Sequence, residues 1–532
     1  MDEPVPSPGN ASENAFQKSI QNQNLGDSPN SVSLSRRRRR SHFVTDRQIL
    51  PDFVASSLTT HEQAQSYFST FFQGCDHYVP VFDPDFDTFE SVKSRSSVLF
   101  GAICTIGCRI QMGADSHQWR LLNFQLKRML NCSLSVTNNA SLETVQAMLV
   151  QACYSAERSL LVATATRLAV DIGLPDAYDD LTSQLSLPNN GQSENSISSL
   201  MRQTRAWLHL LILGHILHVD AGDLLTFKLA GDARRTRVLL EYKSATVLDR
   251  FLLAQVELNV IRANIYSSLS GLVVENAGDE EIMDVVRDSR IDIGLWYSDW
   301  ERLFHDIRPT PPWLLVNLRV QKCWAETIAL CRAVRIAGID NVDFMSETQK
   351  SILSMAKESL GQHLDVILKE PRSYLQNLRF AMDFVWAKCA FCYLLLLKLS
   401  VLLPDGSPAW NEDLINSGNV LISELAETGD GSEGGSHTGK LYLQLLKTGI
   451  EKFTRAIGEQ QSGPHGNAAD ETSPGELDAF VPEQFVFEWD FPGLTLFSSS
   501  TTGIGWLDDI LLGALNGGND TFGLTAFLND ES

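Results

Sequence analysis

The sequence predicts an all-α protein, in which a large multi-helix domain is flanked by a disordered N-terminal arm and an acidic C-terminal tail. Over residues 59–457, apolar side chains recur at helical spacing and strand-like alternation is rare. The 532 residues are 43% hydrophobic and 20% charged, which is enough apolar material for a sizeable core. The formal net charge of −22 argues against a broad surface for binding nucleic acid, because phosphate binding needs an excess of Lys and Arg.

Residues 1–58 are predicted to form the disordered arm, because Ser, Asn and Pro dominate and few aromatic side chains are present. No apolar segment typical of a secretory signal peptide occurs near Met1. The arm carries a run of five arginines, Arg36, Arg37, Arg38, Arg39 and Arg40. Adjacent guanidinium groups repel one another and stay solvated, so we interpret the run as a nuclear import signal for an import receptor. A solvated charge run without a partner is the alternative.

The helical domain is predicted over residues 59–457. Thr59 or Thr60 is expected to cap a first helix over residues 61–73, which the two prolines of residues 78–84 end. Further helices are predicted over residues 94–111, 116–132, 142–155, 158–172, 198–218, 250–271, 280–302, 312–336, 346–370, 372–403, 414–426 and 441–457. Gly173 is expected to end the 158–172 helix in the left-handed conformation. Residues 429–439 are predicted to be a glycine-rich loop.

The most hydrophobic stretch, residues 380–403, is long enough to cross a membrane. Asp383, Lys388 and Lys398 interrupt it, and charges near the centre of a helix are costly in hydrocarbon. We therefore predict a buried core helix and no membrane partner.

Motifs for catalysis and nucleotide binding are missing or incomplete. Residues 429–434 fit Gly-x-Gly-x-x-Gly, but a helix is predicted before them where a dinucleotide fold needs a strand. Residues 434–440 begin like a Walker loop, but Leu441 stands where Ser or Thr would hold magnesium. Neither Gly-x-Ser-x-Gly nor His-Glu-x-x-His occurs. The sequence therefore predicts no enzyme, no catalytic residues and no cofactor.

Nine cysteines, an odd number in so long a chain, indicate reduced thiols rather than a disulfide framework. Cys389 and Cys392 form one Cys-x-x-Cys pair, and Cys104 and Cys108 lie one helical turn apart. A structural zinc site needs four ligands, and neither pair has a second pair near it in the sequence. We predict no metal site and treat these thiols as small buried hydrophobic groups.

Three stretches of the helical domain carry a resemblance to a known family. They are residues 67–86 with 97–107, which include Tyr78-Val79-Pro80-Val81-Phe82-Asp83-Pro84, then residues 143–154 with 163–175, and residues 202–210, which begin Arg202-Gln203-Thr204-Arg205-Ala206-Trp207. Together they resemble the middle homology region of the fungal-specific transcription factors, which normally follows a binuclear zinc cluster that binds DNA. The resemblance covers roughly 400 residues in outline, as degenerate apolar patterns rather than ligand sets.

Two departures from the family pattern matter. Gly214-His215 and Ala221-Gly222-Asp223 replace an Asp-Arg or Asp-His pair and a Gly-Arg-Pro. No cysteine precedes Cys75, so the six-cysteine module is missing from this chain. The resemblance implies a regulatory domain, with DNA reached through a partner or through a zinc cluster that lies outside this sequence.

The tail, residues 458–532, holds three clusters in which acids alternate with large apolar side chains. Such a composition is typical of activation segments, because a partner groove can bury the aromatic groups that the carboxylates keep solvated. Docking of these aromatics back onto the helical domain is the alternative. The candidate contact residues are Phe485, Phe487, Trp489, Phe491, Trp506, Leu507, Ile510, Leu511, Phe522, Leu524 and Phe527.

These features predict a nuclear regulator of transcription that acts as an activator, and the resemblance implies control of a fungal metabolic or biosynthetic gene set. Its expected partners are a coactivator or the transcription machinery, and a homo- or heterodimer is left open. The alternative function is a helical ligand-binding protein or an enzyme without a recognised motif.

Overall fold

In the computed structural model, the described residues form α-helices and short 3-10 helices, and no strand occurs among them. The structure describes residues 51–135, 140–155, 157–186, 194–218, 233–275, 278–307, 309–336, 346–404, 408–430 and 437–462. The all-α prediction is confirmed. The five arginines and every candidate residue of the tail lie outside the described residues.

The N-terminal helices pack around α3. This group consists of α1 (His61–Phe71), the short helix η1 (Cys75–His77), α2 (Phe89–Arg95), α3 (Ser97–Met112), α4 (His117–Ser135), α5 (Leu142–Tyr154) and α6 (Arg158–Asp171). Helix α3 contacts α1, α2, α4 and α5. Thr60 begins α1 as predicted, since its hydroxyl accepts a hydrogen bond from the backbone N–H of Gln63, whose side chain accepts one from the Thr60 N–H.

Helix α8 joins this group to the rest of the domain. After α6, Gly173 adopts the predicted left-handed conformation with φ 79°, and η2 (Leu174–Asp176), α7 (Ala177–Ser186) and α8 (Glu194–His218) follow. Helix α8 contacts α5 and α6 of the N-terminal group and also α7 and α9.

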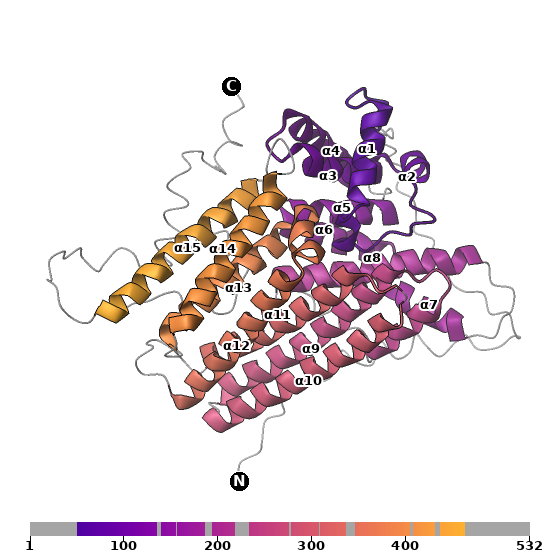
Figure 1. The fold of residues 1–532 in the computed structure, drawn as a ribbon. Helices are drawn as coiled ribbons and strands as arrows, with labels where there is room; N and C mark the ends of the chain where they lie inside the picture. Colours follow the sequence, from indigo (N-terminus) through magenta and orange to yellow (C-terminus); the bar gives the residue numbers. More distant parts are fainter. Residues whose placement is uncertain are drawn as a thin grey trace, which may run out of the picture. The chain divides into compact units, whose positions relative to one another are not determined.

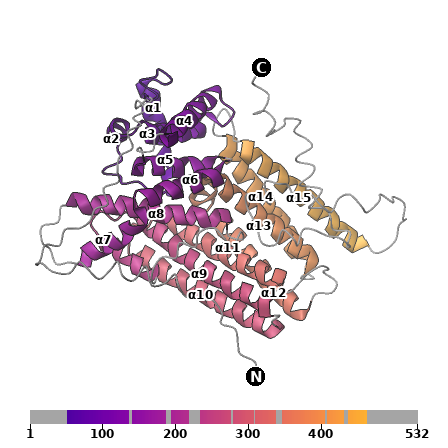
Figure 2. The ribbon, with the colours of Figure 1, turned by 180° about the vertical axis from the view of Figure 1, so that it is seen from behind.

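Four long helices pack side by side in the order in which they occur along the chain. They are α9 (Val247–Glu275), preceded by η3 (Ala233–Glu241), then α10 (Asp279–His305), α11 (Pro312–Ile336) and α12 (Glu347–Lys369). Each contacts the next, and both ribbon views show α9 to α12 side by side (Figures 1 and 2).

The C-terminal part is built around α13. It comprises η5 (Pro371–Ser373), η6 (Leu375–Phe380), α13 (Asp383–Leu402), α14 (Pro408–Asp430) and α15 (His437–Ser462). Helix α13 contacts α12, α14 and α15, and 94% of its most apolar 18-residue stretch is buried inside the domain. By length and composition alone it is the one helix among the described residues that could cross a membrane. Its burial against other helices confirms the prediction of a core helix.

The predicted single helix over residues 372–403 is wrong. Two 3-10 helices and the extended residues Ala381 and Met382 precede α13. The break is held by contacts that a local pattern does not reveal: the Trp386 indole donates to the Leu378 carbonyl (2.8 Å), and the hydroxyl of Tyr154 donates to the Phe380 carbonyl (2.7 Å).

Several predicted boundaries also shift. The predicted arm reaches residue 58, but Phe53 is fully buried and lies next to Gly101 of α3. Helices α2 and α7 form where the sequence predicts none. Helix α14 runs through Asp430 and α15 starts at His437, so both ends of the predicted loop over residues 429–439 are helical. Helix α15 also continues past the predicted end at residue 457.

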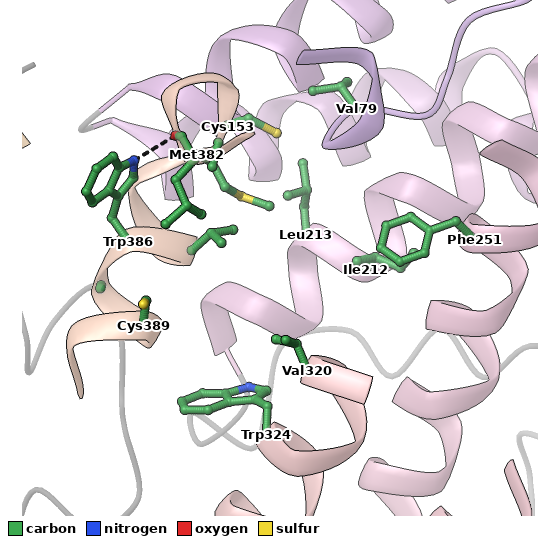
Figure 3. Packing of buried hydrophobic residues seen from close by; sticks show 14 of the residues in the cluster. Val79, Cys153, Ile212, Leu213, Phe251, Val320, Trp324, Met382, Trp386 and Cys389 are labelled. Carbon is green, nitrogen blue, oxygen red and sulfur yellow. Dashed lines mark hydrogen bonds between the residues drawn. The ribbon is translucent and has the colours of Figure 1, made fainter. Parts of the chain in front are cut away.

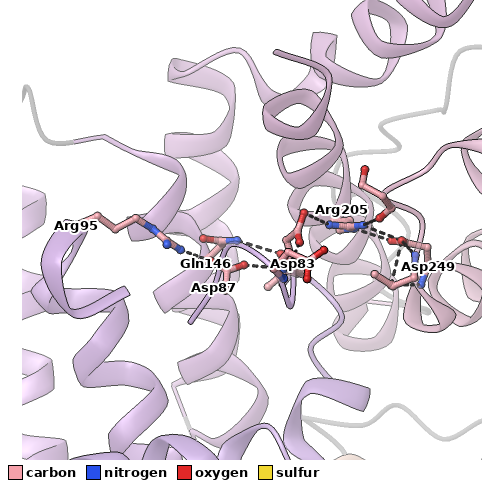
Figure 4. Close-up of polar contacts among 10 residues, drawn as sticks. Asp83, Asp87, Arg95, Gln146, Arg205 and Asp249 are labelled. Carbon is pink, nitrogen blue, oxygen red and sulfur yellow. Dashed lines mark hydrogen bonds and ion pairs between the residues drawn. The ribbon is translucent and has the colours of Figure 1, made fainter. Parts of the chain in front are cut away.

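A buried polar network fixes how the N-terminal group meets α8 and α9 (Figure 4). At its centre, Arg205 of α8 is 1% exposed, and its guanidinium donates to both carboxylate oxygens of Asp249 (2.7 and 2.8 Å) and lies 3.4 Å from Asp83. Asp87 accepts a hydrogen bond from the Asp83 N–H (2.6 Å) and pairs with Arg95 of α2. The chain of charges thus runs from α2 to the start of α9.

Helices α1 and α3 approach so closely that a glycine is required between them. A Cβ on Gly107 would overlap the carbonyl oxygen of Tyr67, whereas Gly294 of α10 has open space around its Cα. We expect Gly107→Ala to lower the free energy of unfolding by about 2–3 kcal/mol, because the backbone of α1 must move. Gly294→Ala should raise it by about 0.5–1 kcal/mol. Chemical denaturation of both variants checks this, and equal effects would contradict the close approach.

Asp249→Asn should destabilise the domain by about 3–5 kcal/mol, because Arg205 would keep its buried charge and lose its main counter-charge. The matched control is Asp284→Asn, which removes an exposed ion pair with Arg287 (2.6 Å) and should change stability by less than about 1 kcal/mol. Thermal and urea unfolding measure both. A small effect at Asp249 would mean that Asp83 alone compensates Arg205.

Candidate functional site: a buried cationic cavity

A cavity of about 50 Å³ lies where η1, α8, α9, α11 and α13 meet. Its floor consists of buried side chains such as Ile212, Phe251 and Val385, and its rim of half-buried ones such as Asn259 and Gln321. Figure 3 shows Ile212, Phe251, Trp324 and Met382 converging on this region from different parts of the chain. At about 10–15 Å³ for each water, the volume suits about three waters or a chemical group of that size.

Lys388 is the most unusual residue of the lining. It lies in the second turn of α13 and is 3% exposed, yet its ammonium makes no hydrogen bond or ion pair with any described residue. Its Nζ lies 5.9 Å from the centroid of the Trp324 ring, a cation–π contact that offsets only part of the lost hydration. Burial lowers the pKa of Lys388 from 10.5 to about 8, so the side chain is still mostly protonated at pH 7.

The other ionisable groups of the lining leave the cavity positive. Arg262 of α9 adds a second positive charge. Burial lowers the pKa of His77 to about 4 and that of His209 to about 3, so both imidazoles are neutral at pH 7. None of the described lining residues is Asp or Glu. The site is therefore cationic with no carboxylate of its own.

His209 presents a second unsatisfied polar group. It is 2% exposed, and its Nδ1 has no hydrogen-bond partner in the described part of the chain, while its Nε2 lies 3.9 Å from the Cys153 sulfur. The Cys153 thiol is not poised to react, because burial raises its pKa to about 12. The amide side chain of Gln255 adds further donors to the lining, and that of Asn317 adds the N–H that is not used by the Trp313 carbonyl (2.8 Å). The arrangement can bind an anion.

The prediction that four of the cysteines are buried is confirmed. Cys104, Cys108, Cys389 and Cys392 are all buried in the hydrophobic core, as predicted. Within the residues that the structure describes, no group of three His, Cys, Asp or Glu could hold a metal ion. Gly439, which ends the Walker-like stretch, lies inside α15 against Trp386.

Sequence reasoning missed Lys388 as a site residue. In the sequence, Lys388 was interpreted only as a charge that disfavours a membrane span. A lysine inside an apolar helix was nevertheless the available signal, because a buried charge needs either a partner or a ligand. Its neighbours at the cavity come from residues 77–388 of the chain, and no local pattern identifies them.

Lys388→Met should stabilise the domain in the absence of ligand. Below pH 8 the folded protein holds a buried charge that the unfolded chain solvates, which from the shift in pKa amounts to about 3 kcal/mol. Above the folded pKa the folded protein releases this proton while the unfolded chain keeps it until about pH 10.5. The advantage of the Met variant should therefore be full at pH 7 and shrink between pH 8 and 10.5.

Lys357→Met is the matched control for this prediction. Lys357 is also a buried lysine, at 6% exposure, but its Nζ donates to the Leu403 carbonyl (2.8 Å). Its replacement should lower stability, since the carbonyl loses its partner. Urea unfolding at several pH values measures both variants, and a Lys388→Met variant less stable than the parent at pH 7 would contradict the prediction.

The comparisons with known proteins add no relative to this description. No family model, no curated protein and no solved structure matches the chain. The site therefore stands on its own geometry.

Proposed function

We propose that the chain is a nuclear regulator of transcription, an activator of a fungal metabolic or biosynthetic gene set. In this proposal the helical domain is regulatory, Arg36 to Arg40 direct nuclear import, and residues 458–532 recruit a coactivator or the transcription machinery. DNA is reached through a partner or through a zinc cluster outside this sequence. The proposal assigns the chain no catalytic role.

The observation that carries the proposal is the composition of the C-terminal segment. Residues 456–532 contain 13 acidic residues and no Lys or Arg, with aromatic side chains between the acids. In the cluster around Trp506, helical spacing puts Trp506, Leu507, Ile510 and Leu511 on one side and Asp508 and Asp509 outside it. A partner groove can take up such an apolar face.

The helical domain adds support of a different kind. Two of the stretches that resemble the fungal regulators are in direct contact, since Asp83 pairs with Arg205 (3.4 Å) and the Arg202 guanidinium lies 3.6 Å from the centre of the Phe86 ring. These two stretches therefore meet in the folded domain.

A ligand-binding protein without a role in transcription is the second candidate. The cavity at Lys388 favours it, because an unpaired buried ammonium is suited to binding a ligand. The two candidates differ in where the protein resides and in what the tail does.

The activation function is tested by fusing residues 456–532 to a neutral DNA-binding domain with a reporter gene. The fusion should activate the reporter. Replacing both Phe487 and Trp506 by Ala should weaken activation by roughly tenfold, the effect of losing about 1.4 kcal/mol of partner binding. Replacing Asn516 and Asn519 by Ala is the control, because both lie between the clusters and should leave activation unchanged.

Two outcomes count against the regulator. A silent fusion would remove the activation function. A tagged full-length chain that stays cytoplasmic, with the five arginines intact or replaced by Ala, would contradict nuclear action and favour the ligand-binding protein.

A further inference from the structure

We propose that the cavity at Lys388 binds the carboxylate of a small organic monocarboxylic acid. The inference concerns a ligand of the helical domain and does not depend on whether the chain regulates transcription. It rests on three features of the cavity: an unpaired buried ammonium, a lining without acidic residues, and a volume that fits one small group.

The buried ammonium of Lys388 lacks a counter-charge. Lys388 is 3% exposed and its ammonium has three donors, yet no described residue accepts a hydrogen bond from it. Buried charges in proteins are almost always paired, because an isolated one loses its hydration without compensation. The neighbouring His363 of α12 supplies no counter-charge, because burial lowers its pKa to about 3 and leaves it neutral, and its Nε2 lacks a partner among the described residues. An anion in the cavity would satisfy Lys388.

The surroundings of Lys388 suit an anion with a single charge. The walls beside Lys388 are largely apolar and aromatic, with Met382, Val385 and Trp324 among them. Such walls solvate the second charge of a phosphate or sulfate dianion poorly, and Arg262, the other cationic side chain of the lining, already has interactions of its own. A single carboxylate needs only one ammonium and one or two further donors. The amide of Gln255 can serve as such a donor, as can the second N–H of the Asn317 amide, whose other N–H donates to the Trp313 carbonyl (2.8 Å).

The size of the cavity limits the ligand. A volume of about 50 Å³ admits a carboxylate with one or two carbons, and nothing as large as a nucleotide. The half-buried rim is mostly polar, but it includes the aromatic side chains of Tyr78, Phe384 and His77, the last stacked on Trp313 with 4.1 Å between the ring centroids. An acid with a flat apolar substituent can therefore place its carboxylate at Lys388 and its substituent along the rim. Both the free small acid and the carboxyl end of a larger one share this chemistry.

Isothermal titration of the purified full-length chain at pH 7 tests the proposal. The probes are acetate, propionate and benzoate, each paired with its neutral amide, together with inorganic phosphate. At least one carboxylate should bind, its amide should bind at least roughly tenfold more weakly, and phosphate should bind more weakly than that carboxylate. Tight binding of propionate alone would indicate a free small acid, whereas preference for benzoate would indicate a larger one.

Variants locate the binding. Lys388→Met and Lys388→Gln should each weaken carboxylate binding by roughly tenfold to a hundredfold, the usual range for one charge-assisted contact. Lys357→Met should bind like the parent, because Lys357 lies outside the cavity. Lys388→Met is expected to be folded and more stable, so a loss of binding cannot be ascribed to unfolding.

Three results would overturn the proposal. The first is that no carboxylate binds at 20 mM, roughly the upper limit for a specific weak ligand. The second is that Lys388→Met binds carboxylate as tightly as the parent does. The third is that phosphate binds more tightly than every carboxylate. The first would mean that water alone fills the cavity, and the last that the site takes an inorganic anion. None of these results bears on the reporter assay, so failure here leaves the proposed activation function standing.

Discussion

The geometry of the domain depends on one buried guanidinium. Arg205 joins the turn that carries Asp83 to the start of α9 at Asp249, and it also donates to the Ser244 carbonyl (2.7 Å). A buried ion network adds little net stability, because desolvation consumes most of the Coulomb attraction. The network instead fixes the relative position of the helices. Hydrophobic contacts allow helices to slide past one another, whereas the hydrogen bonds from a guanidinium to fixed carboxylates do not. The network therefore sets the register of the N-terminal group against α8 and α9, and α8 supplies His209 and Ile212 to the cavity.

The opposite wall of the cavity is held by the same N-terminal group. Arg109 of α3 pairs with Asp383 at the start of α13 (3.1 Å), and Tyr154 of α5 holds the carbonyl of Phe380. Lys388 lies little more than one helical turn beyond Asp383, so its position follows from these contacts. One group of helices thus positions both α8 and α13, and the cavity is the space that their separation leaves.

Much of the helical pattern was predictable, and the site was not. Local features determine where α1 begins, at the capping side chain of Thr60, and where α6 ends, at Gly173, so the sequence indicates them directly. The burial of α13 followed from its composition. The break before α13 did not, because it depends on Tyr154, more than two hundred residues earlier in the chain. The cavity is further removed from local pattern, since it depends on five elements that come together only in the folded domain.

The late position of α13 in the chain has a consequence for synthesis. Its contact faces on α12 and around the cavity, including Trp324, are translated before the helix that covers them. A nascent chain that has not reached residue 402 therefore carries uncovered apolar surface on α12 and around the cavity. Exposed apolar surface of this kind is prone to aggregation until α13 has left the ribosome.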